Sequence, residues 1–156
     1  MTATNKVFYF DLEETLITSF NKPTLVNENT IEDYILLNNI KEIGIFSAAI
    51  NDTRDKGHFI DNIKAGIEKR YNVIIVEERI LMLQQLADMF MDTFNISMSV
   101  SEMLSLYGKD GIFKRYCKDT HKTNKRCYLI DDSYENELNV YSNRNLFIEI
   151  ININSF

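Results

Sequence analysis

Short apolar runs alternate along the chain with longer segments in which apolar residues recur every three or four positions. The runs are mostly continuous rather than interrupted by polar residues, which is typical of parallel strands covered on both faces. The pattern predicts strands at residues 6–11, 42–47, 73–76, 127–130 and 146–151.

In the connections between these runs, apolar residues recur at the spacing of a helix. Thr30 is placed to cap a helix that runs to Ile40, and Asn51 or Asp52 to cap one that runs to Tyr71. The alternation of strands and helices predicts an α/β fold, with a parallel sheet of about five strands, right-handed crossovers and helices on both faces. Further helices are expected at residues 77–94, 99–107 and 111–118.

The helix expected at 77–94 is rich in leucine and methionine and is apolar well beyond one face. Burial of this helix within the domain is the favoured interpretation. A homodimer interface through the same helix is the alternative, because methionine-rich surfaces adapt readily to partners.

Composition favours one compact unit. With one proline, five glycines and no low-complexity linker among 156 residues, we expect a single domain spanning 1–156. The net charge of -6 argues against broad nonspecific binding of nucleic acid. A local basic stretch is interpreted as a solvated face, with steering of a polyanion as the alternative; it comprises Lys114, Arg115, Lys118, Lys122, Lys125 and Arg126.

Cysteine usage and hydropathy indicate a cytoplasmic location. Cys117 and Cys127 lack a zinc-ligand spacing, and free thiols fit a reducing compartment. No apolar stretch approaches the roughly 20 residues that span a bilayer, and no signal peptide is recognisable. We therefore expect no membrane association.

Acidic residues follow two of the predicted strands. Asp11 and Glu13 come at the end of the first run, and Asp131 and Asp132 close the run at 127–130. Because ligands bind beyond the carboxyl ends of strands in open α/β sheets, these acids are expected to converge if the two strands are close together. Adjacent carboxylates repel unless a cation neutralises them, so the sequence predicts a site for Mg²⁺.

Taken in order, segments 11–16 and 46–47, Lys109 and segment 131–133 resemble the four motifs of haloacid dehalogenase-like (HAD) hydrolases. Most members of that family cleave phosphate monoesters, and their core is a three-layer, Rossmann-like sheet. The resemblance implies a Mg²⁺-dependent phosphohydrolase that works through an aspartyl-phosphate. Asp11 would be the nucleophile and Glu13 the general acid and base, although the family more commonly has aspartate at the latter position.

The resemblance also implies roles for the later motifs. Ser47 would bond a phosphoryl oxygen, and Lys109 would neutralise phosphoryl charge, with Lys118 as its competitor. Mg²⁺ would be held by Asp11, by the main-chain carbonyl of Glu13, and by the acid pair, of which Asp132 is the first choice and Asp131 the second. Asn136 and Glu137 are expected around these ligands.

The connections between the motifs are too short for a large cap domain. A capless or minimally capped site would admit a phosphorylated small molecule, a polymer end or a phosphoprotein. Two other functions stay open: a catalytically weak HAD-like binding or regulatory protein, and a nucleic-acid end-processing phosphatase.

Overall fold

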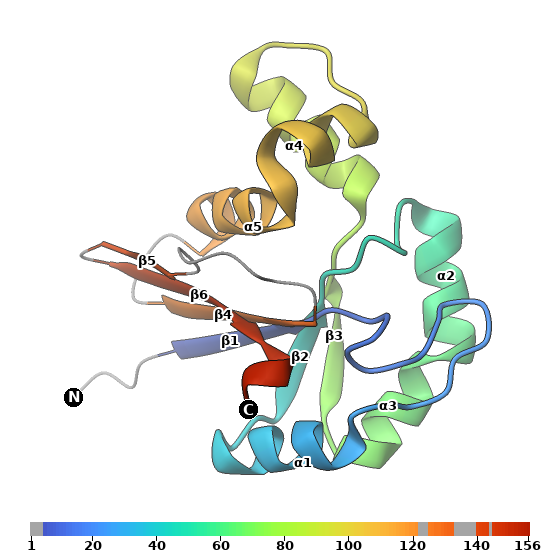
Figure 1. The fold of residues 1–156 in the computed structure, drawn as a ribbon. Coiled ribbons are helices and arrows are strands. Elements are labelled where there is room, and N and C mark those ends of the chain that lie inside the picture. The colour runs from blue at the N-terminus through green and yellow to red at the C-terminus, as the bar shows by residue number, and fades with distance from the viewer. Residues whose placement is uncertain (1–4, 122–124, 133–139, 144) are drawn as a thin grey trace.

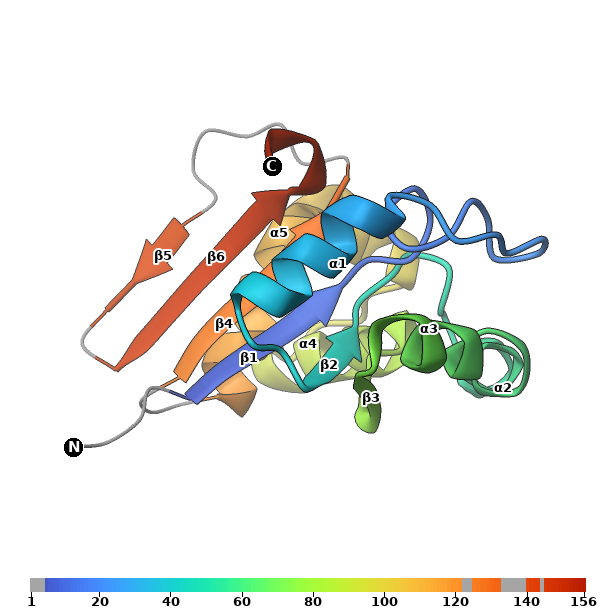
Figure 2. The ribbon, with the colours of Figure 1, turned by 90° about the horizontal axis from the view of Figure 1, so that it is seen from below.

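The computed structural model describes residues 5–121, 125–132, 140–143 and 145–156. A six-stranded sheet with the order β3-β2-β1-β4-β6-β5 forms its centre (Figure 2). All neighbouring strands pair in parallel except β5, which runs antiparallel to β6. The predicted α/β class is confirmed, with one short edge strand more than expected. The strands are β1 (Asn5–Phe10), β2 (Glu42–Ile45), β3 (Ile74–Ile80), β4 (Lys125–Asp131), β5 (Val140–Ser142) and β6 (Leu146–Asn152).

Helices cover both faces of this sheet (Figure 1). In the part of the chain that the structure describes, none of them is long and apolar enough to cross a membrane. One face carries α1 (Glu28–Leu37), α2 (Thr53–Asn62) and α3 (Lys64–Tyr71), and the other carries α4 (Leu83–Phe94) and α5 (Val100–Thr120). A short 3₁₀ helix, η1 (Ile153–Ser155), follows β6.

The central strand β1 shows why its sequence is apolar throughout. Phe8 and Phe10 belong to the core beneath α1, α2 and α3, whereas Val7 and Tyr9 belong to the core beneath α4 and α5. Alternate side chains of a strand point to opposite faces, so a strand between two helical layers must be apolar at every position. The three predicted layers follow from this pattern.

The helix expected at 77–94 is wrong over its first six residues. β3 continues to Ile80, which pairs with Ile45 of β2, and α4 begins only at Leu83. β3 is an edge strand, so the exposed Glu77 and Glu78 face solvent and look like the polar face of a helix. The buried side chains of α4 pack within the chain, as the favoured interpretation holds.

Two other helix boundaries also differ from the expectation. Asn27, in the left-handed conformation, precedes α1, so Thr30 is not its cap. The single helix expected up to Tyr71 breaks at Ile63 into α2 and α3, although its predicted cap is correct: the Asp52 side chain accepts hydrogen bonds from the backbone N–H groups of Arg54 and Asp55.

A kink at Gly108 divides α5 into two helical stretches, as predicted, although the second begins at Lys109 and not after Gly111. The backbone of Gly108 has φ 67° and ψ 166°, a region that residues with a side chain rarely adopt. Ser99 and Glu102 form a reciprocal capping box that starts the first stretch. The second stretch therefore begins in a new direction, and Lys109 is its first residue.

Candidate metal centre

Three segments end at the same edge of the sheet. The Phe46 N–H donates to the Phe10 carbonyl at 3.0 Å, so Asp11 and Ser47 each follow these paired residues directly. The Asp11 N–H donates to the carbonyl of Ile130, the residue before Asp131, at 2.9 Å. Parallel strands thus deliver all three side chains to the carboxyl edge, where ligands bind in open α/β sheets.

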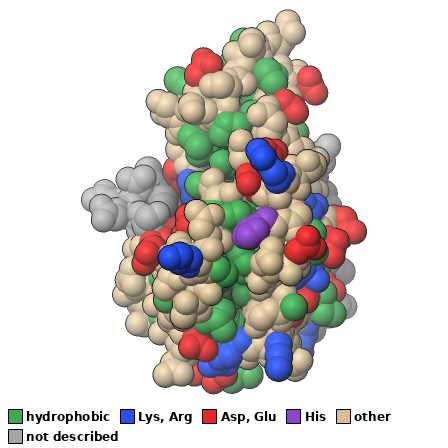
Figure 3. Space-filling view, turned by 90° about the vertical axis from the view of Figure 1, so that its right-hand side faces the viewer, with side chains coloured by type: hydrophobic (Ala, Val, Ile, Leu, Met, Phe, Trp, Pro, Cys, Tyr) green, Lys and Arg blue, Asp and Glu red, His purple; other side chains and the backbone are tan. Residues whose placement is uncertain are grey.

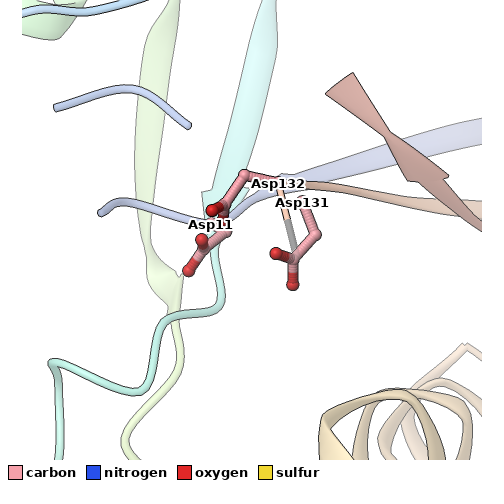
Figure 4. A group of neighbouring side chains, drawn as sticks. All are labelled: Asp11, Asp131 and Asp132. Carbon is pink, nitrogen blue, oxygen red and sulfur yellow. The ribbon is translucent and has the colours of Figure 1, made fainter. Parts of the chain in front are cut away.

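The carboxylates of Asp11, Asp131 and Asp132 form one cluster at this edge (Figure 4). One oxygen from each lies within 4.8 Å of the others, close enough for a shared ion. Asp11 and Asp131 are 6% and 3% exposed, whereas Asp132 is half-buried. The convergence expected from the two acidic strand ends is confirmed.

The ammonium of Lys109 contacts this cluster. Its Nζ lies 2.7 Å from Asp11 Oδ1 and 2.8 Å from Asp131 Oδ2, and 5.5 Å from the centroid of the Phe46 ring. The competing Lys118 instead places its Nζ 4.1 Å from the centroid of the Tyr141 ring. Burial alone would lower the pKa of Lys109, but Asp11 and Asp131 outweigh it and raise that pKa, so the ammonium stays charged.

Thr15 links two of the acids from inside the loop that follows β1. Its Oγ1 lies 3.3 Å from both Asp11 Oδ2 and Asp132 Oδ1, and the residue is fully buried. A tight turn places it there, because the N–H groups of Thr15, Leu16 and Ile17 all donate to the Leu12 carbonyl.

Electrostatics show that the cluster suits a cation. Burial raises the pKa of Asp11 to about 7, Asp131 and Asp132 act in the same direction, and Lys109 opposes them. The cluster gathers three carboxylates, and Lys109 neutralises part of their charge. Hard carboxylate oxygens are the donors that Mg²⁺ prefers, and a bound divalent ion would favour ionised Asp11. The donor set therefore fits the expected magnesium ion.

The other two expected site residues lie nearby in the chain, with side chains bonded to local backbone. Glu13 is half-buried, and its Oε2 accepts a hydrogen bond from the Phe20 N–H at 2.8 Å. Its carboxylate does not belong to the acidic cluster found among the described residues. Ser47 is buried, and its Oγ accepts from the Ala49 N–H at 3.1 Å. The chemical roles expected of both residues stay predictions.

Some features of the site have no clear signal in the sequence. The contact between Phe20 and Glu13 depends on how a loop folds back, and no apolar period encodes it. Gly108 did carry a signal, because a glycine between two helical stretches marks a break. Ser133, Asn136 and Glu137 lie outside the described residues.

No family model, curated protein or solved structure matches this chain.

Proposed function

We propose that the protein is a Mg²⁺-dependent phosphohydrolase that cleaves phosphate monoesters through an aspartyl-phosphate on Asp11. The observation that carries this proposal is the placement of Lys109, whose ammonium contacts both Asp11 and Asp131 at the edge where Asp132 completes a three-carboxylate cluster. A nucleophile, a cation for phosphoryl charge and oxygen ligands for a metal thus meet at one point.

Asp11, Asp132 and Asp131 would hold the metal, with the main-chain carbonyl of Glu13 as a further ligand. When bound, Mg²⁺ would supply positive charge that stabilises the phosphoryl oxygens and keeps Asp11 ionised. The buried location of Asp11 and Asp131 makes that charge more effective than it would be in water.

The chain's own residues account for two chemical steps. In the first, a carboxylate oxygen of Asp11 bonds to phosphorus, the bond from phosphorus to the ester oxygen breaks, and Glu13 donates a proton to the departing oxygen. In the second, Glu13 takes a proton from water, whose oxygen bonds to phosphorus while the bond to Asp11 breaks and phosphate leaves. Dividing the reaction matters because uncatalysed monoester hydrolysis requires a barrier reduction of about 20 kcal/mol or more.

Lys109 and Ser47 would act on the transferred group rather than on the leaving group. The Lys109 ammonium would neutralise charge on the phosphoryl oxygens, and the Ser47 hydroxyl would donate a hydrogen bond to one of them. Small molecules, polymer ends and phosphoproteins all remain within the proposed substrate range, because the chemistry involves only the phosphoryl group.

A catalytically weak binding protein is the second candidate. It is favoured by the same Lys109 contacts, because an ammonium already in place between Asp11 and Asp131 neutralises part of the charge that would attract a metal.

Turnover of p-nitrophenyl phosphate, with Mg²⁺ or with EDTA, separates the two candidates. We expect Mg²⁺-dependent release of nitrophenol that falls by about 10³-fold or more in Asp11→Asn, which removes the nucleophile. The matched control is Glu14→Gln, which removes an exposed acid from the same loop and is expected to leave turnover unchanged. A wild-type protein that binds Mg²⁺ but turns over no member of a broad phosphate-ester panel would contradict the hydrolase and favour the binding protein.

A further inference from the structure

A small hairpin at residues 16–26 follows the acidic strand end of β1. The Thr18 N–H donates to the Thr24 carbonyl at 2.8 Å, and the Val26 N–H to the Leu16 carbonyl at 3.1 Å. The hairpin extends from the carboxyl edge of the sheet toward α2 (Figure 1). Its tip carries exposed residues, including Asn21 and Lys22, so little apolar burial fixes its position.

Phe20, at the tip of this hairpin, contacts His58 of α2. The two ring centroids lie 4.9 Å apart, and His58 Nε2 lies 3.4 Å from the Phe20 carbonyl oxygen. Figure 3 shows this side of the molecule, with a histidine at the surface among hydrophobic side chains. The hairpin is therefore attached to a helix that packs against the core.

Asn62 orients the His58 ring. Its Nδ2 lies 3.2 Å from His58 Nδ1, one turn further along α2. An amide nitrogen can only donate, so Nδ1 accepts, and neutral His58 carries its proton on Nε2. That is the tautomer which can donate to the Phe20 carbonyl.

The Phe20 backbone then reaches the proposed acid. The Phe20 N–H donates to Glu13 Oε2 at 2.8 Å, while its carbonyl faces His58. Contacts thus run without a break from Asn62 through His58 and Phe20 to Glu13. The proposed proton donor is held by a residue whose own position depends on α2.

We propose that His58 and Phe20 are positioning residues that fix Glu13 for proton transfer to the leaving oxygen, an inference that rests on the proposed phosphohydrolase function. Neither side chain needs to touch the substrate. We call the contacts from His58 through Phe20 to Glu13 the clamp. Loss of the clamp would leave Asp11, Lys109 and the proposed metal ligands in place, while the Glu13 carboxylate would lose its fixed orientation.

Comparing two esters whose leaving groups differ in their need for a proton gives a specific readout. A merely structural role of His58 would lower the activity on both esters equally. p-Nitrophenolate is a stable anion that departs without a proton, whereas an alkoxide needs one in the transition state. In His58→Ala we expect kcat/KM, which reports the steps up to departure of the leaving group, to fall by about 10- to 100-fold with an alkyl phosphate and by less than about threefold with p-nitrophenyl phosphate. Glu13→Gln should show the same pattern with a larger effect.

Three further variants complete the test. Phe20→Leu removes the ring contact while keeping an apolar side chain, and should reproduce the selective loss. His58→Gln keeps a donor for the Phe20 carbonyl, so part of the alkyl phosphate activity should return. Lys22→Ala, at the same exposed tip, is the matched control and should leave both substrates unaffected.

The possible outcomes test the positioning of Glu13 separately from the proposed phosphohydrolase activity. An equal loss with both substrates in His58→Ala and Phe20→Leu, or no loss in either, would overturn the clamp while leaving the hydrolase standing. A wild-type protein without turnover of either ester would overturn the hydrolase and the clamp together. Thermal unfolding of each variant checks that it is folded. If His58→Ala does not fold, Phe20→Leu provides the test instead.

Discussion

Thr15 is the side chain through which two acids of the cluster share one hydroxyl. Its Oγ1 lies within hydrogen-bonding distance of Asp11 and Asp132, in a fully buried position. A hydroxyl proton can serve only one acceptor at a time, so Thr15 stabilises whichever carboxylate is more charged. Groups behind metal ligands fix ligand orientation and commonly influence affinity strongly.

Thr15→Val should test this contribution, because valine keeps the shape and removes the hydroxyl. We expect a loss of about 1–2 kcal/mol in the free energy of unfolding, measured in urea with EDTA, since the hydrogen bond is buried. The dissociation constant for Mg²⁺, measured by calorimetry, should rise about tenfold. Thr15→Ser is the control: it loses a methyl group but should keep metal affinity, and a similar loss of affinity in both variants would contradict the role of the hydroxyl.

Residue-scale prediction succeeded where strand ends decided the outcome. Asp11, Asp131 and Asp132 could be brought together from sequence because acids that close neighbouring parallel strands share an edge. The contact between Phe20 and His58 could not be predicted from the sequence, because 38 residues separate them and the contact depends on one loop conformation.

At the scale of elements, the kink in α5 decides where Lys109 points. Gly108 adopts φ 67° and ψ 166°, and a Cβ at this position would lie 2.8 Å from Asp110 Oδ1. An L-residue would have to leave this conformation or bear strain of about 1–3 kcal/mol. Either response would turn the second helical stretch and move Lys109 relative to the acids.

Gly108→Ala should therefore lower both stability and turnover. We expect a loss of about 1–3 kcal/mol in urea unfolding and a clear fall in kcat for p-nitrophenyl phosphate. Gly66→Ala, within α3, is the control: no atom of the described residues lies within 4 Å of its added Cβ, so it should stabilise the fold by about 0.5–1 kcal/mol. Unchanged turnover in Gly108→Ala would show that the kink does not position Lys109.

Element types were easier to predict than their ends. The break between the two stretches of α5 was readable because Gly108 interrupts a helical pattern. The boundary between β3 and α4 could not be predicted from the sequence. The edge position of β3 leaves Glu77 and Glu78 exposed, and local sequence does not encode which strand is at an edge. The three-residue β5 is too short for any period to reveal.

At the scale of the whole molecule, metal binding at the acidic cluster would be coupled to folding. An ion that binds the folded chain alone stabilises it by about 2.7 kcal/mol at 100 times its dissociation constant. For a chain of this size, each kcal/mol raises the melting temperature by about 2–4 °C. We expect Mg²⁺ to raise the melting temperature of the wild type and to have little effect on Asp132→Asn. Glu14→Gln serves as the charge-matched control, and an equal rise in all three proteins would place the ion elsewhere.

In the core beneath α4 and α5, the buried His121 places its Nε2 3.0 Å from the Tyr9 hydroxyl. Burial lowers the pKa of His121 to about 4, and Arg79 and Lys125 act in the same direction. In the unfolded chain the imidazole binds a proton near pH 6.5. Between these values the unfolded state binds more protons, so the free energy of unfolding should fall as pH is lowered from about 6.5 to 4.

A shift of this size corresponds to an upper limit of about 3 kcal/mol in the free energy of unfolding. His121→Gln loses the pH-dependent part, so the difference in stability between wild type and variant should shrink by about 1–2 kcal/mol from pH 7.5 to pH 4.5. Urea unfolding in EDTA at both pH values measures it without interference from metal. A difference that stays constant with pH would mean that His121 is protonated in the folded protein as readily as in the unfolded chain.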